Sequence, residues 1–221
     1  MTVFKRNLTS ELLEKVTRKN LEAIRLPLSF LEIGCGDGNI SRSIALDFPE
    51  HKYFASDISY EAIETARKLV MQDKSCEIEF RVSDGFQAWN NKKFDLILCD
   101  ISAINQSIAE LSEWYVGVEC NSGENGLEAI RPIISSVSNF LNPNGIFILP
   151  RISSSNSLEM EMLLSQRFSS IFISERKEWP MPKNLSQLIA EKKVTNKGID
   201  WQTSLKFGLE IAYTEILLCQ I

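Results

Sequence analysis

The sequence predicts an α/β protein built on an open, mostly parallel β-sheet. From residue 28 onward, short apolar segments alternate with amphipathic helical ones, which is typical of strand–helix–strand units. Residues 28–33 are apolar and bounded by Pro27 and Gly34, as expected of a parallel strand covered on both faces. A glycine-rich turn follows directly, at the position where open α/β sheets bind nucleotides. A chain of 221 residues can bury one sizeable core, so we expect one domain over residues 1–221.

Hydrophobic periodicity and the Pro and Gly breakers place the elements in order. Strands are expected over residues 28–33, 52–56, 77–82, 94–99, 146–149, 170–174 and 210–219. Helices are expected over residues 9–25, 39–48, 59–71, 107–114, 126–141, 157–168 and 184–193. The segment Asn142-Pro143-Asn144-Gly145 predicts a turn.

Two segments lie outside the regular alternation. Residues 1–27 contain the first helix, which either packs on the sheet or forms a lid beside the cleft. Residues 178–208 form a long mixed insertion, expected over the acceptor side if the strand before it is parallel to the others. There, Trp179, Met181 and Trp201 either line a small apolar pocket or belong to the core.

Composition narrows the class of function. The chain carries 24 Lys and Arg against 29 Asp and Glu, with no dense basic run, so no nucleic-acid partner is expected. No apolar run is long enough to span a bilayer and no signal peptide is apparent, so we expect a cytoplasmic protein without a membrane partner. Five dispersed cysteines without C-x-x-C spacing predict no metal site. The single histidine, His51, is expected in an exposed turn, which disfavours histidine-base chemistry.

The glycine turn indicates a ligand other than NAD or a nucleoside triphosphate. Gly34, Gly36 and Gly38 form G-x-G-x-G, with the third glycine one residue too early for the dinucleotide pattern G-x-G-x-x-G. The Lys-Ser/Thr pair of a phosphate-binding P-loop is absent. The turn alone is a weak signal, because glycines serve many tight turns.

Acidic residues at the ends of consecutive predicted strands strengthen that signal. Glu32 and Asp57 lie at the ends of the first two strands, and Asp57 can accept both hydroxyls of a ribose. Asp84 can accept from an exocyclic amine, with Phe86 available to stack on a base, and Asp100 ends the fourth strand. Any one of these acids could be a solvated loop residue. Together, with no cationic phosphate clamp, they suit a positively charged ligand without phosphate, and S-adenosylmethionine fits that description.

On these residues the chain resembles the class I S-adenosylmethionine-dependent methyltransferases from about residue 28 to its end. The resemblance implies a Rossmann-like fold of seven strands, mostly parallel, with an antiparallel last strand. It also implies that the three glycines border the methionine moiety, Asp57 the ribose, and Asp84 with Phe86 the adenine. The cofactor-binding residues implied are Glu32, Gly34, Gly36, Gly38, Asp57, Ile58, Asp84, Gly85, Phe86 and Asp100.

Three further segments resemble the HemK-type release-factor glutamine methyltransferases. These are residues 94–100, 123–131 and 141–145, which include the sequence Gly-Glu-Asn-Gly-Leu-Glu. Where that family carries Asn-Pro-Pro-Tyr, this chain has Asp100-Ile101-Ser102-Ala103, and it lacks the family's N-terminal helical domain. We therefore expect a different acceptor, recognised by different residues.

Asp100 is the first candidate for a catalytic or acceptor-orienting role, because a carboxylate can hydrogen-bond an amine or take its proton. It could equally act on the cofactor alone. Ser102 could orient the substrate or be an ordinary loop serine, and Tyr115 with Trp114 could wall the pocket or anchor a loop.

The sequence is interpreted as a methyltransferase with a small-molecule or peptide acceptor, methylated on nitrogen or oxygen. Two alternatives stay open. One is an enzyme that cyclises S-adenosylmethionine and releases methylthioadenosine, and the other is a non-catalytic protein that binds the cofactor.

Overall fold

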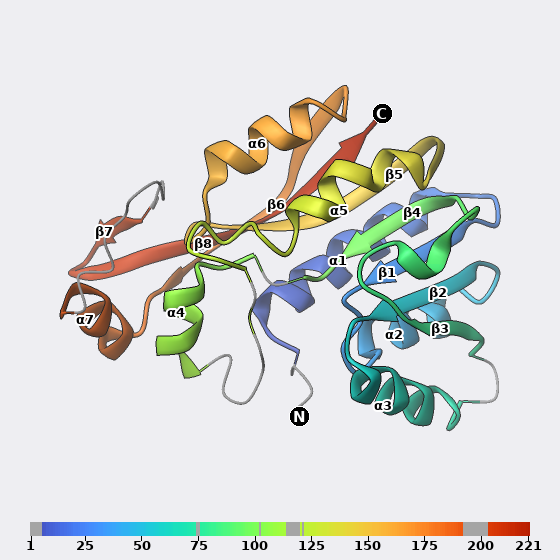
Figure 1. Ribbon diagram of the computed structural model, residues 1–221, viewed down its shortest axis with the longest axis horizontal. Coiled ribbons are helices and arrows are strands. Elements are labelled where there is room, and N and C mark those ends of the chain that lie inside the picture. Colours follow the sequence, from blue (N-terminus) through green and yellow to red (C-terminus); the bar gives the residue numbers. More distant parts are fainter. Residues whose placement is uncertain (1–5, 74–75, 102, 114–119, 121, 192–202) are drawn as a thin grey trace.

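The computed structural model describes residues 6–73, 76–101, 103–113, 120, 122–191 and 203–221. One mixed sheet runs through it in the order β3-β2-β1-β4-β5-β8-β6, and β7 pairs with β8 (Figure 1). The strands are β1 (Ser29–Ile33), β2 (Lys52–Asp57), β3 (Ile78–Val82), β4 (Phe94–Cys99), β5 (Leu141–Ile152), β6 (Ser170–Pro180), β7 (Ser204–Lys206) and β8 (Leu209–Gln220). The predicted α/β class, with a mostly parallel sheet and an antiparallel last strand, is confirmed.

Helices cover both faces of the sheet. They are α1 (Leu8–Ala23), α2 (Asn39–Asp47), α3 (Tyr60–Val70), α4 (Gln106–Leu111), α5 (Arg131–Ser136), α6 (Ser157–Ser165) and α7 (Lys183–Glu191), with 3₁₀ turns η1 (Gln87–Trp89) and η3 (Val137–Asn139). Residues of α1 and α2 share a core with Phe30 and Leu98, whereas α5 and α6 share another with Leu31 and Ile97. Neighbouring residues of one strand point to opposite faces, so the two cores lie on opposite sides of the sheet.

Strands β1 to β5 are parallel, and β8 runs antiparallel to both β5 and β6. Strand β6 therefore has the direction of the parallel set, and its carboxyl end lies at the same edge of the sheet. The segment that follows it contains α7 and β7, at the end of the molecule far from α3 (Figure 1). The predicted insertion over residues 178–208 thus starts inside β6.

Helix α1 is packed on the sheet. The Asn7 side chain accepts from the Ser10 N–H and caps the first turn. Leu12, Leu13 and Val16 are buried in the core shared with α2. The predicted amphipathic helix is confirmed, and of its two interpretations the packed one applies along most of its length.

Several element predictions need correction. The helix expected over residues 126–141 starts only at Arg131, because Gly126 has a φ of +72° that a right-handed helix excludes. The turn at Asn142–Gly145 forms within β5, where the register with β4 shifts and Asn144 has a φ of +64°. The short strand β7, which pairs with β8, was not predicted.

His51 is not an exposed turn residue, as the sequence analysis expected. Its side chain is buried at the start of β2, and Nδ1 accepts from the Leu28 N–H at 3.4 Å. The ring also stacks on Phe48. Burial lowers the pKa of His51, so the ring serves as a neutral packing group. Among the described residues, no helix combines the length and apolar character needed to cross a membrane.

Candidate active site

The glycine turn after β1 is held between the ends of its two neighbouring strands. The N–H groups of Gly34 and Cys35 both donate to the Ser56 carbonyl at the end of β2, at 2.8 and 3.0 Å. On the other side, a Cβ on Gly34 would lie 2.8 Å from the Asp100 carbonyl oxygen after β4. Gly34 also has a φ of +78°. Both the lack of space for a Cβ and this left-handed backbone conformation therefore favour glycine at this position. The turn therefore has one fixed place at the carboxyl edge of the sheet.

Asp57 joins this turn to helix α3. Its Oδ2 accepts from the Gly36 N–H and its Oδ1 from the Ser59 N–H, both at 2.9 Å. Ser59 in turn caps α3 by accepting from the Ala62 N–H. The structure thus brings together two residues predicted for one site, although 21 positions separate them. A carboxylate has about four lone-pair sites, so Asp57 keeps capacity for two further donors.

Glu32 faces inward from β1 and holds the first turn of α2. Its Oε2 accepts from the Ser41 N–H at 3.0 Å and also from the Ser41 hydroxyl. Burial, followed by the nearby charges of Asp100 and Asp37, raises the pKa of Glu32 well above its usual range. Oε1 is buried with no hydrogen-bond partner among the described residues. Glu32 therefore supports the turn from behind, and direct contact with a ligand stays a prediction.

The segment after β3 differs in detail from the expected adenine site. Asp84 is exposed, but Phe86 is buried and stacks on Phe140 with ring centroids 4.2 Å apart. A Cβ on Gly85 would lie 2.6 Å from Ile133 Cδ1, so this turn is packed against α5. One face of the Phe86 ring thus belongs to the core.

The exposed apolar side chains near Asp57 are Ile58, at 72% exposure, and Tyr60, at 61%. Exposed side chains of this kind can cover a flat ring. Ile58 was among the predicted site residues, whereas Tyr60 was not. Its aromatic side chain directly after the capping Ser59 was the available signal.

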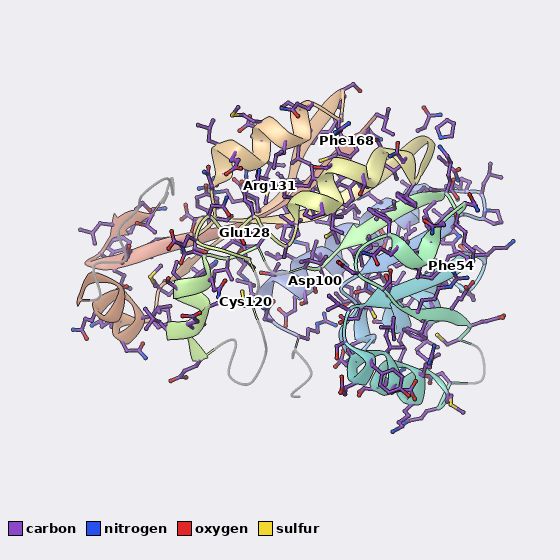
Figure 2. All side chains as sticks on the ribbon, viewed as in Figure 1. Phe54, Asp100, Cys120, Glu128, Arg131 and Phe168 are labelled. Atoms are coloured by element: carbon purple, nitrogen blue, oxygen red, sulfur yellow. The ribbon has the colours of Figure 1, made fainter. Side chains whose placement is uncertain are left out.

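Asp100 is partly buried at the end of β4, where Figure 2 labels it. Its N–H donates to the Ile33 carbonyl at 2.9 Å, and its Oδ2 accepts from the Ser10 hydroxyl at 2.8 Å. Burial raises the pKa of Asp100 to about 6, assisted by the charge of Asp57, while Ser10 and Arg6 act in the opposite direction. Near neutral pH this carboxyl can therefore exchange a proton.

Three segments meet around Asn105, five residues after Asp100 in the chain. The Asn105 N–H donates to the Ser154 carbonyl after β5, at 3.3 Å, and the Gln106 N–H donates to the Gly123 carbonyl at 2.9 Å. A Cβ on Gly126 would lie 2.9 Å from Ser155 Cβ, so the segment that includes Gly126 fits closely between these loops. Asn105 was not predicted from the sequence, and its side chain caps α4 and also donates to the Glu124 carbonyl.

Four predicted residues, namely Ser102, Trp114, Tyr115 and Trp201, lie outside the described residues. Of the remaining aromatic and apolar candidates, Met181 is buried in a small cluster with Ile104 and Leu185. The Trp179 ring packs against this cluster, and its Nε1–H donates to Thr214 Oγ1 at 3.1 Å. The core interpretation applies to both side chains.

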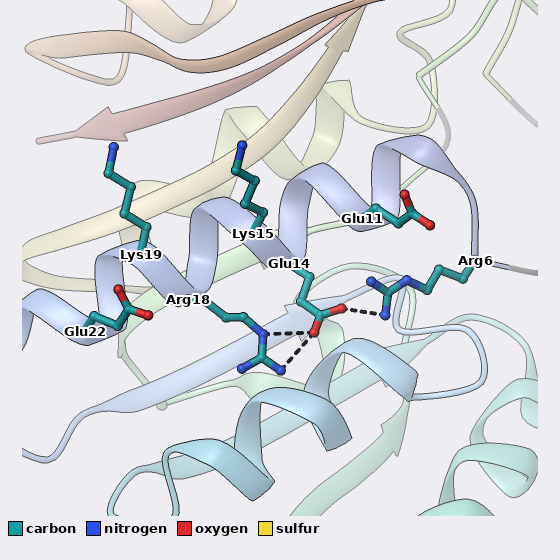
Figure 3. A pocket seen from close by; sticks show the side chains of 7 residues that line it. All are labelled: Arg6, Glu11, Glu14, Lys15, Arg18, Lys19 and Glu22. Atoms are coloured by element: carbon teal, nitrogen blue, oxygen red, sulfur yellow. Dashed lines mark hydrogen bonds and ion pairs between the residues drawn. The ribbon is translucent and has the colours of Figure 1, made fainter.

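A separate open hollow lies along helix α1, away from the glycine turn (Figure 3). Its lining is entirely charged and consists of Arg6, Glu11, Glu14, Lys15, Arg18, Lys19 and Glu22. Arg6 and Arg18 both form ion pairs with Glu14, so charges that line the hollow are partly neutralised by one another.

Comparison with known proteins agrees with this arrangement. The family model described as "Methyltransferase domain" matches residues 27–203, which include the glycine turn, Asp57 and Asp100. The chain belongs to this family. The resemblance to S-adenosylmethionine-dependent methyltransferases drawn from the sequence is thereby confirmed.

Relatives and solved structures extend the comparison. A bifunctional methyltransferase of Rickettsia typhi is 30% identical over 139 residues, or 59% of this chain and 27% of that protein. A release factor glutamine methyltransferase of Koribacter versatilis is 28% identical over 147 residues, covering 64% of this chain and 51% of the relative. The chain thus spans about a quarter of the length of the first relative and about half of the second. The structure of a precorrin-6y C5,15-methyltransferase from Geobacter metallireducens shares the fold, with a TM-score of 0.61, 12% identity and coverage of 99% and 93%.

Proposed function

We propose that the chain transfers the methyl group of S-adenosylmethionine to a nitrogen acceptor that Asp100 orients. The observation that carries the proposal is the position of Asp100. It extends β4 beside the glycine turn, within the edge where Asp57 and Gly36 are joined. Membership of the methyltransferase family indicates the type of reaction. The carboxylates at the strand ends favour a cationic ligand.

The residues present fit S-adenosylmethionine. The glycines at Gly34 and Gly38 let the turn pack closely against Asp100 and Ala66. Beside this turn, Asp57 retains lone pairs for two ribose hydroxyls. Ile58 leaves an apolar side chain exposed next to Asp57, where it can cover the adenine. When bound, the cofactor supplies an electrophilic methyl group on a sulfonium, and the sulfur keeps the electron pair of the broken carbon–sulfur bond.

The protein's part in the reaction is orientation and proton handling. Asp100 accepts an N–H of the acceptor and so aims the nitrogen lone pair along the line of displacement. As the nitrogen becomes a cation, the Asp100 carboxylate stabilises the new charge and takes the proton. A carboxyl whose pKa is about 6 is suited to accept a proton and to release it again near neutral pH.

The comparisons favour an acceptor nitrogen carried by a peptide side chain. The Koribacter relative is named for glutamine methylation of a release factor. This chain replaces the amide-binding Asn-Pro-Pro-Tyr segment of that family with Asp100-Ile101-Ser102-Ala103. The carboxylate of Asp100 binds an amine more strongly than the neutral amide of an asparagine at this position would. We therefore infer that the acceptor nitrogen is more basic than that of glutamine.

A transfer assay tests the proposal. The protein is incubated with S-adenosylmethionine and a panel of glutamine peptides, lysine peptides and small amines, and the products are measured by mass spectrometry. We expect S-adenosylhomocysteine and an acceptor heavier by one methylene unit, formed only when both substrates are present. Methylthioadenosine formed without any acceptor would contradict the proposal, as would a lack of turnover across the panel despite tight cofactor binding.

A further inference from the structure

Helix α1 makes a direct side-chain contact with the proposed reaction centre. The hydroxyl of Ser10 donates to Asp100 Oδ2 at 2.8 Å, across 90 residues of sequence. Ser10 is 3% exposed, so water does not compete freely for its hydroxyl. A hydrogen bond from a buried donor to a carboxylate is stronger than one between neutral groups. The contact therefore restrains the side chain of Asp100.

Both partners are fixed independently of this contact. Ser10 lies in the first turn of α1, where its N–H donates to the capping side chain of Asn7 at 3.1 Å. One turn further, the fully buried Leu13 anchors the helix in the core beneath. Asp100 is fixed through its backbone, whose N–H donates to the Ile33 carbonyl at the end of β1. A donor and an acceptor held by separate elements define one orientation of the carboxylate.

We propose that Ser10 is a positioning residue that orients the Asp100 carboxylate toward the acceptor nitrogen. The inference rests on the proposed function, because it assigns Ser10 a part in the same site. Helix α1 is then more than a cover for the sheet. Most of the helix packs on the sheet, and its capped first turn contributes Ser10 to the site.

Several charged groups face Asp100, and Ser10 acts among them. Asp57 approaches from the end of β2 and Glu32 from β1, and both disfavour a second negative charge. Arg6, which precedes α1, favours that charge. Ser10 is the neutral donor in direct contact, and its hydrogen bond lowers the pKa that burial raises. Loss of the hydroxyl is therefore expected to raise the pKa of Asp100 further.

A carbon-13 NMR titration of the carboxyl groups tests this inference without an acceptor. The Asp100 signal is assigned with the variant Asp100→Asn and followed from pH 4 to 9 in wild type and Ser10→Ala. We expect the pKa of Asp100 to rise by about one unit in Ser10→Ala, which is typical of losing a hydrogen bond to a charged group. Ser10→Thr, which keeps the hydroxyl, should restore most of the wild-type pKa.

The matched control is Thr17→Val. Thr17 lies seven residues further along the same face of α1 and is fully buried, and its hydroxyl has no hydrogen-bond partner among the described residues. This variant removes a buried hydroxyl from α1 without touching Asp100, so the pKa of Asp100 should not change. An unshifted pKa in Ser10→Ala would overturn the inference, and so would an equal shift in Thr17→Val. If Ser10→Ala does not fold, Ser10→Cys takes its place, since a thiol is a weak donor of similar size.

Turnover separates this inference from the proposed function. With an acceptor found in the transfer assay, Ser10→Ala should lower kcat about tenfold and leave the KM for S-adenosylmethionine unchanged, while Ser10→Thr recovers activity. The acidic limb of its pH profile should move to higher pH. If wild type transfers no methyl group, the proposed function fails while the NMR titration still decides the role of Ser10. If wild type is active and Ser10→Ala matches it at every pH, the positioning role fails alone.

Discussion

Asp100 combines a partly buried position with a charge that its surroundings disfavour. Burial and the neighbouring Asp57 raise its pKa to about 6, and the single hydrogen bond from Ser10 offsets this only in part. A carboxyl with a raised pKa that lies beside the glycine turn is a candidate functional group, because a proton-handling role requires a pKa near the working pH.

The raised pKa has a consequence for stability. The folded protein holds the Asp100 proton more tightly than the unfolded chain does. Protonated Asp100 therefore contributes fully to the free energy of unfolding below about pH 4, and this contribution is lost as the pH rises through about 6. Asp100→Asn cannot ionise and should avoid this loss. We expect it to be more stable than wild type by about 2 kcal/mol at pH 8, with the difference shrinking toward pH 4. Urea unfolding at several pH values measures this, and a pH-independent difference would contradict it.

Sequence reasoning at single residues succeeded where chemistry and strand position coincide. The place of Asp57 beside the glycine turn could be predicted because the carboxyl ends of neighbouring parallel strands meet at one edge of the sheet. Its role toward a ribose stays a prediction. The contact of Ser10 with Asp100 could not be predicted, since no local pattern connects positions 90 residues apart. His51 was placed wrongly because its burial depends on the packing of Phe48 and Tyr53 around it.

Helix α1 shows how an element outside the strand–helix alternation can serve the site. Its apolar face docks on the sheet through residues such as Leu13 and Val16. The docked helix then delivers Ser10 to Asp100. Anything that loosens the docking is therefore expected to disturb both stability and the orientation of Asp100.

Truncation of the docking face checks this dependence. Leu13→Ala should lower the free energy of unfolding by about 2–4 kcal/mol, because a fully buried leucine leaves a cavity. The matched control is Leu26→Ala, since Leu26 is 75% exposed and its loss should change stability by less than about 0.5 kcal/mol. Chemical denaturation of both variants gives the comparison. Equal effects would mean that α1 is not anchored as described.

The accuracy of the predicted elements followed the strength of their local signals. Strand β4 was predicted to the residue, because Phe94–Cys99 is apolar and sharply bounded. The helix before β5 was extended too far, because its apolar pattern gave no warning that Gly126 takes a left-handed conformation against Ser155. Strand β6 was predicted too short, because its charged second half resembles a loop and is a strand through pairing with β8.

Across the whole molecule, the sheet order places the glycine turn, Asp57 and Asp100 at one edge. Strand β1 lies between β2 and β4, so the turn after it contacts the ends of both neighbours. This order was not predicted from the sequence, since strand–helix alternation alone fixes no strand order. The fold is shared with the methyltransferase family, and the residues at this edge determine which acceptor is used.

Calorimetric titration with S-adenosylhomocysteine tests most directly whether this edge is the cofactor site. Wild type should bind at one site, and Asp57→Ala should bind about 10- to 100-fold more weakly, because hydrogen bonds to a charged group are lost. Glu50→Ala removes an acid before β2 and should bind as wild type does. Unchanged affinity in Asp57→Ala, with wild type binding tightly, would contradict the placement of the cofactor at this edge.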